Sequence, residues 1–176
     1  MLPIVEIRYH APPNPTTRGS VQTAMTDDGD RFEEYERMVL ADLLAEAVKT
    51  PDDALLHQFI GRGYVGRRDC ISAIRYFKRA IKLDPSDAWN HLYLGDVWCR
   101  LRRYADAMES FRTALRLMPE VACPYWCLAD VHFAVGDHDQ AGEFYRKACD
   151  VVAEDPTAKQ RLSDWLARTT VRSRRR

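Results

Sequence analysis

A repeat of 34 residues runs through the middle of the chain and constrains the fold more than any other feature. Each copy carries a small residue, an aromatic residue and further small residues at the same offsets, and the first two copies end in proline. The matched sets are Gly61, Ala73, Phe77, Ala80 and Pro85; Gly95, Ala107, Phe111, Ala114 and Pro119; and Ala129, Ala141, Tyr145 and Ala148. Self-similarity at this period is the signature of a helical repeat array, in which each unit packs only on its neighbours.

The spacing inside one copy predicts two antiparallel helices. Gly95 and Ala107 are separated by the distance from the middle of one helix to the start of the next. Small side chains at both places let the two backbones approach at the short end of the roughly 8–10 Å range of helix–helix distances. Phe111 lies on the same face as Ala107 and fills the space beside the crossing. Pro119 then ends the second helix, because proline cannot continue it.

These residues resemble the tetratricopeptide repeat, a family of 34-residue helix–turn–helix units. The middle copy carries the signature most fully, as Leu94, Gly95, Trp98, Tyr104, Ala107, Phe111, Ala114 and Pro119. Arg68 and Arg102 stand where the family often has glycine, which here only the third copy supplies, as Gly136. The resemblance covers Asp52 to about Pro156. It implies an all-α fold, a right-handed α-solenoid of antiparallel helix pairs with a capping helix at each end.

The remaining segments follow from composition and periodicity. Residues 1–26 contain four prolines and no helical period, so we expect a flexible arm, in which Leu2–Tyr9 alternates loosely like a strand without a partner. Met25 also resembles a natural start. The intact mass of the native protein would show whether it begins at Met1 or at Met25. Residues 27–51 are predicted to form an N-terminal capping helix, unbroken from Asp30 to Lys49. The predicted order continues with repeats at about 54–87, 88–121 and 122–155 (52–156 in all), a C-terminal capping helix at 157–170 and a basic tail at 171–176.

The bulk composition excludes several classes of function. Lysine and arginine number 26 and so do aspartate and glutamate, so net charge favours neither nucleic acid nor a membrane surface as the partner. No apolar run approaches the ~20 residues that a membrane-spanning helix needs. The five cysteines, an odd number, fall mostly at core positions of predicted helices. This pattern indicates reduced thiols and a cytoplasmic location.

Residue types that carry catalysis or bind metals do not occur at the required spacing. Cys123 and Cys127 are one helical turn apart, but no Cys-x-x-Cys or His–carboxylate pair supports a closed zinc site. The sequence contains neither a glycine-rich phosphate loop nor a nucleophile elbow. We therefore expect no metal, no cofactor and no enzymatic activity.

The resemblance implies that the first helix of each repeat lines a concave groove. The candidate groove residues are Gln58, Phe59, Arg62, Trp89, Leu92, Tyr93, Asp96, Trp126, Asp130 and Phe133. Aromatic anchors are typical of peptide-binding surfaces. We therefore expect a non-catalytic scaffold or adaptor that binds a peptide or a helical segment of another protein.

The same positions argue against a ligand held by its terminal carboxylate. Family members that bind such ligands use lysines and asparagines at the fifth and ninth positions of the repeat. This chain has Gln58, Leu92 and Trp126 at the fifth, and Arg62, Asp96 and Asp130 at the ninth. We expect instead an apolar or mixed-charge ligand, with a basic residue that meets Asp96 or Asp130.

A row of basic turns predicts a different function. The residues of this basic ridge are Arg67, Arg68, Arg100, Arg102 and Arg103, and the arginines of the tail extend the positive charge. Together they would suit a nucleic acid or an anionic surface. The third copy breaks the ridge with Gly136-Asp137-His138, so solvated turns are the simpler interpretation and nucleic acid is disfavoured. Self-association through an end of the stack is a third alternative.

Overall fold

The computed structural model describes Tyr35, residues 38–151, Gln160 and Ser163, and within these residues all regular secondary structure is helical. The helices are α2 (Leu40–Lys49), α3 (Ala54–Gly66), α4 (Cys70–Leu83), α5 (Ala88–Arg100), α6 (Tyr104–Leu117), α7 (Ala122–Val135) and α8 (His138–Val151). The starts of α3, α5 and α7 are spaced by the repeat length, and so are those of α4, α6 and α8.

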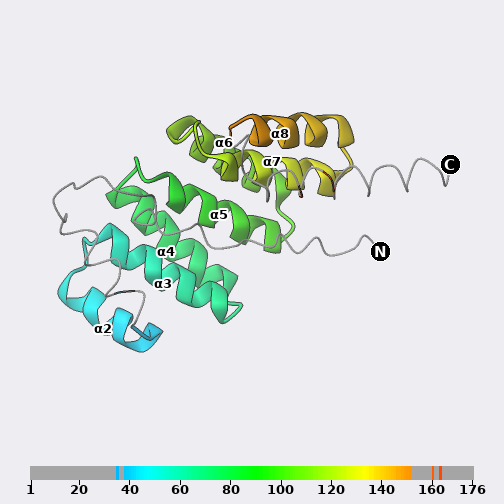
Figure 1. Ribbon diagram of the computed structural model, residues 1–176. Helices are drawn as coiled ribbons and strands as arrows, with labels where there is room; N and C mark the ends of the chain where they lie inside the picture. The colour runs from blue at the N-terminus through cyan, green and yellow to red at the C-terminus, as the bar shows by residue number, and fades with distance from the viewer. Residues whose placement is uncertain (1–34, 36–37, 152–159, 161–162, 164–176) are drawn as a thin grey trace.

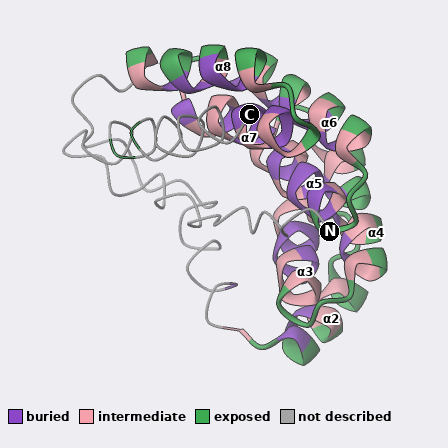
Figure 2. Cartoon of the chain, turned by 90° about the vertical axis from the view of Figure 1, so that its right-hand side faces the viewer, coloured by how far each residue is buried: buried purple, intermediate pink, exposed green. Residues whose placement is uncertain are grey.

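The helices pack as consecutive pairs, α3 with α4, α5 with α6 and α7 with α8, and each pair packs on the next (Figure 1). The stack curves, as Figure 2 shows, with α3, α5 and α7 in the layer on the concave side and α4, α6 and α8 in the outer layer. The predicted all-α class and helical-pair architecture are confirmed. Among the described helices, none is both long and apolar enough to cross a membrane.

One glycine and one phenylalanine set the closest approach within each of the first two repeats. A Cβ atom at Gly61 would lie 2.7 Å from Cε1 of Phe77, and one at Gly95 would lie 2.7 Å from Cδ1 of Phe111. Both rings are fully buried and cannot move aside. In the third repeat Ala129 and Tyr145 occupy the equivalent positions, and both are buried.

The turn within each repeat needs one residue with a left-handed backbone. Arg68 (φ 60°), Arg102 (φ 59°) and Gly136 (φ 90°) occupy this position. Only glycine adopts it without the steric strain that a Cβ causes. The position where the family often has glycine is therefore a real left-handed turn, and two arginines adopt it here.

The prediction of one unbroken helix from Asp30 to Lys49 is wrong. Val39 is extended (φ −78°, ψ 157°), and α2 begins only at Leu40. The break is compatible with a tertiary contact: the hydroxyl of Tyr35 donates to Asp53 Oδ2 at 2.8 Å, and its ring lies 5.9 Å from that of Phe59. The arm at 1–26, the tail at 171–176 and, except for helical Gln160 and Ser163, the predicted C-terminal helix lie outside the described residues.

Candidate protein-binding surface

The ten predicted groove residues all belong to α3, α5 and α7, the layer on the concave side, but they differ in burial. Four are buried in the stack: Gln58, Phe59, Leu92 and Asp96. Six are half-buried: Arg62, Trp89, Tyr93, Trp126, Asp130 and Phe133. We call these six residues the inner face. They are the members of the predicted set whose side chains retain substantial exposed area.

Gln58 holds the first repeat to the second and is a structural residue. Its Nε2 donates to Asp87 Oδ2 at 2.8 Å, and Asn90 Nδ2 donates to the same oxygen at 2.8 Å. The other carboxylate oxygen of Asp87 accepts from the backbone N–H of Trp89 and caps α5. Burial raises the pKa of Asp87, while these hydrogen bonds act in the opposite direction.

Both acidic residues that were expected to meet a basic ligand have partners within the chain. Asp96 accepts from Arg100 Nε at 2.8 Å, and Asp130 accepts from the hydroxyl of Tyr145. Burial raises the pKa of Asp96, and the ion pair with Arg100 opposes that shift. A basic ligand residue would have to compete with Arg100 or Tyr145 for these carboxylates.

Arg62 differs from the acidic residues because part of its hydrogen-bonding capacity is unused. Its guanidinium carbon lies 4.8 Å from the ring centre of Phe59 and 5.7 Å from that of Tyr93. Tyr93 is itself fixed by stacking on Phe77, with ring centres 5.5 Å apart. The Nη1 atom of Arg62 is buried and has no hydrogen-bond partner among the described residues. The arrangement holds a cation in position on aromatic rings.

The aromatic side chains of the inner face are anchored at one side by the core. Trp89 packs against the cluster around Leu92 and Phe111, while Trp126 and Phe133 pack against the cluster around Tyr145. A ring that is fixed by its core contacts loses little further conformational entropy when a ligand covers the rest of it.

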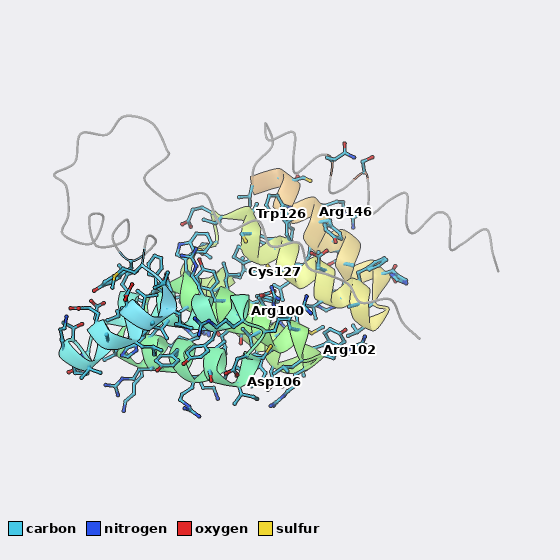
Figure 3. All side chains as sticks on the ribbon, turned by 90° about the horizontal axis from the view of Figure 1, so that it is seen from below. Arg100, Arg102, Asp106, Trp126, Cys127 and Arg146 are labelled. Carbon is cyan, nitrogen blue, oxygen red and sulfur yellow. The ribbon has the colours of Figure 1, made fainter. Side chains whose placement is uncertain are left out.

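The basic ridge is partly neutralised by the chain itself. Arg100 pairs with Asp96, while Arg103 pairs with Asp106 at 2.8 Å and lies 4.4 Å over the ring of Trp98. Arg67, Arg68 and Arg102 are exposed and make no ion pair among the described residues. In Figure 3 Arg102 lies at the turn between α5 and α6, away from Trp126 on α7.

The cysteines are free thiols. Cys99 and Cys127 are buried, and Cys70, Cys123 and Cys149 are half-buried. Burial raises the pKa of Cys99 well above its usual range, and the nearby carboxylates of Asp96 and Asp130 add to the shift. Within the described part of the chain, no group of three histidine, cysteine or acidic residues could hold a metal ion.

Two interactions near this surface were missed at the level of the sequence. The spacing of Asp96 and Arg100, four residues apart on one helix, is the spacing of a stabilising pair and could have indicated their contact. The bridge from Gln58 to Asp87 joins residues of different repeats, and no local pattern marks it.

Two models of the tetratricopeptide repeat family match the sequence, one over residues 60–122 and one over residues 125–151, together about half of the chain. No curated protein matches it.

Several solved structures share the fold. The crystal structure of MamA is 19% identical, with a TM-score of 0.66, and the match covers 87% of this chain and 89% of that one. TTC0263, a thermophilic tetratricopeptide repeat protein of Thermus thermophilus, is 23% identical, with a TM-score of 0.67 and coverage of 73% and 71%. The first repeat domain of Spaghetti (RPAP3), solved with the HSP90 peptide SRMEEVD, is 18% identical, with a TM-score of 0.60 and coverage of 66% and 93%.

Proposed function

Because this chain belongs to the tetratricopeptide repeat family, whose members generally mediate protein–protein interactions, we propose that it is a non-catalytic adaptor. The adaptor binds a peptide or helical segment of a partner protein on the concave side of the stack. The observation that carries this proposal is the row of core-anchored, half-buried aromatic residues on consecutive first helices, Trp89 and Tyr93 on α5 and Trp126 and Phe133 on α7. Such residues are the usual hot spots of protein interfaces.

The relative bound to the HSP90 peptide supports a short segment as the ligand, since that protein has the same fold. The positions that hold a terminal carboxylate in clamp-type family members carry different residues here, so we propose an internal segment rather than a chain end. We place the interaction in the cytoplasm because five cysteines and no spanning helix among the described residues agree with that compartment.

The test is affinity capture from native extract with the intact protein and with the double variant Trp89→Ala/Trp126→Ala. Loss of two anchor rings should weaken capture of a partner protein at least about tenfold. The matched control is Ile71→Ala/Leu117→Ala, which truncates two exposed apolar side chains of the outer layer. Circular dichroism and thermal unfolding must show that both variants are folded. Equal capture by all three proteins would refute the proposed surface.

A second candidate function rests on the exposed residues of the basic ridge, Arg67, Arg68 and Arg102. If they bind nucleic acid, a labelled RNA should bind with an affinity that falls steeply with salt, because counterions are released from the phosphates. Binding that depends on Trp89 and Trp126 and changes little between low and moderate salt would contradict this alternative.

A further inference from the structure

We propose that residues 2–9 of this chain, Leu-Pro-Ile-Val-Glu-Ile-Arg-Tyr, bind the concave side of the same molecule, with Glu6 paired to Arg62. The chain then carries an internal ligand that competes with partner proteins for the inner face. This inference rests on the proposed function, since it assumes that the inner face accepts a short segment of chain.

The unmatched charge on the inner face is the first reason. Asp96 and Asp130 already have partners, whereas Arg62 has a buried Nη1 without one among the described residues. A buried donor that lacks an acceptor is unfavourable, and more so when it is charged. The Arg62 side chain as a whole is half-buried, so a carboxylate on the inner face can approach its guanidinium and form a charge-assisted hydrogen bond.

The composition of the N-terminal arm supplies the complementary group. Glu6 is the one acidic residue among residues 1–26. In an extended segment alternate side chains point the same way, so Ile4 lies on the same side as Glu6, while Val5 and Ile7 turn to the opposite side. With Glu6 at Arg62, Ile4 is placed to cover the exposed part of Tyr93.

The covalent connection places this segment within reach. Tyr35 is held beside α3 by Asp53 and Phe59, so the described chain starts next to the helix that carries Arg62. Residues 10–34 join Tyr9 to Tyr35. A linker of this length spans up to about 80 Å when extended and averages roughly 25–30 Å when flexible. Tethering of this kind gives an effective concentration of the order of millimolar, which makes even a weak contact populated.

The test uses the full-length chain with the photoreactive residue p-benzoylphenylalanine in place of Ile4. After irradiation, cross-links should map to α3 and α5. Arg62→Glu should reduce their yield at least about fivefold by placing like charges together, and Glu6→Arg in the Arg62→Glu background should restore it. The control Arg67→Glu makes the same charge change at an exposed residue after the end of α3 and should leave the yield unchanged.

Four outcomes would overturn the inference: cross-links that map elsewhere, a yield that Arg62→Glu does not change, failure of Glu6→Arg to restore it, or a native protein that starts at Met25. Isotope-labelled and unlabelled chains are also mixed before irradiation. Cross-links between a labelled and an unlabelled chain would show that the segment binds a second copy of the protein, and this result would also overturn the inference. In partner capture, Glu6→Arg should increase the yield. If it does not, while Trp89→Ala/Trp126→Ala abolishes capture, the adaptor function stands and this inference fails.

Discussion

The ring of Phe111 lies against the backbone of Gly95, and the ring of Phe77 lies in the same way against Gly61. Because both rings are fully buried, each glycine is required by its neighbour and not by its own backbone conformation. Gly66, at the end of α3, has no atom within 4 Å of the place where its Cβ would be. The glycines of the first helices therefore differ in what an added methyl group does.

Gly95→Ala should lower the free energy of unfolding by about 1–3 kcal/mol, because the methyl group overpacks the crossing of α5 and α6. Gly66→Ala should raise it by up to about 1 kcal/mol, since alanine is the better helix former. Urea denaturation followed by circular dichroism measures both changes. The packing argument fails if Gly95→Ala is as stable as the parent protein.

A second prediction at this scale concerns the left-handed turn residue Arg68. Arg68→Gly should raise the free energy of unfolding by about 1 kcal/mol, because glycine relieves the strain at φ 60°. Arg67→Gly is the matched control: it removes the same charge at an adjacent exposed residue with φ −86° and should be destabilising. Thermal unfolding compares the two variants, and equal shifts would contradict the strain at Arg68.

At the scale of the helix, the N-termini are stabilised unequally. The side chains of Asp53, Asp69 and Asp87 cap α3, α4 and α5, whereas α6 and α7 begin without a side-chain cap. Asp53 has two roles, because Oδ1 accepts from the backbone N–H of Leu56 at 3.1 Å and Oδ2 accepts from Tyr35. It joins the start of α3 to the chain before α2.

Asp53→Ala should therefore destabilise the protein by about 2 kcal/mol, the sum of a lost cap and a lost tyrosine hydrogen bond. Asp69→Ala, which removes an exposed cap from α4, should be less destabilising than Asp53→Ala. Tyr35→Phe should cost less in the Asp53→Ala background than in the parent protein, because the hydrogen bond between the two side chains is already lost. Chemical denaturation of the two single variants and the double variant tests this, and additive losses of stability would show that the two groups act independently.

At the scale of the molecule, each helix pair packs on its sequence neighbours, so stability is distributed along the stack. The middle repeat has a neighbouring repeat on both sides, and its cluster around Phe111 includes Cys127, Leu128 and Val131 of α7. The cluster around Tyr145 consists of residues of α7 and α8. We therefore expect a substitution in the Phe111 cluster to destabilise more helices than a substitution in the Tyr145 cluster.

Phe111→Ala and Tyr145→Ala each remove a buried ring and should cost about 3–5 kcal/mol locally. Amide hydrogen exchange should show lost protection from α3 to α8 for Phe111→Ala, but mainly in α7 and α8 for Tyr145→Ala. A uniform loss of protection in the Tyr145→Ala protein would mean that the array unfolds as one cooperative unit.

The fold and the candidate site were not equally predictable. The repeat length, the pairing of helices and the residues at each crossing, such as Gly95 with Phe111, could be predicted from the sequence. These depend on spacing along one chain, and the helical period converts spacing directly into a shared face. The resemblance to the repeat family identified the same residues.

Which side chains of that face are buried depends on the packing between repeats and could not be predicted from the sequence. Gln58 and Trp126 occupy the same repeat position, yet Gln58 is buried beside Asp87 and Trp126 is half-buried. Likewise Val39 interrupts a continuous helical pattern, and Arg62 alone among the charged groove residues has a buried atom without a partner in the described chain. This difference arises because every first helix packs against its pair and against the neighbouring repeats. The helical period shows which residues share a face, but it does not show which residues of the neighbouring helices cover that face.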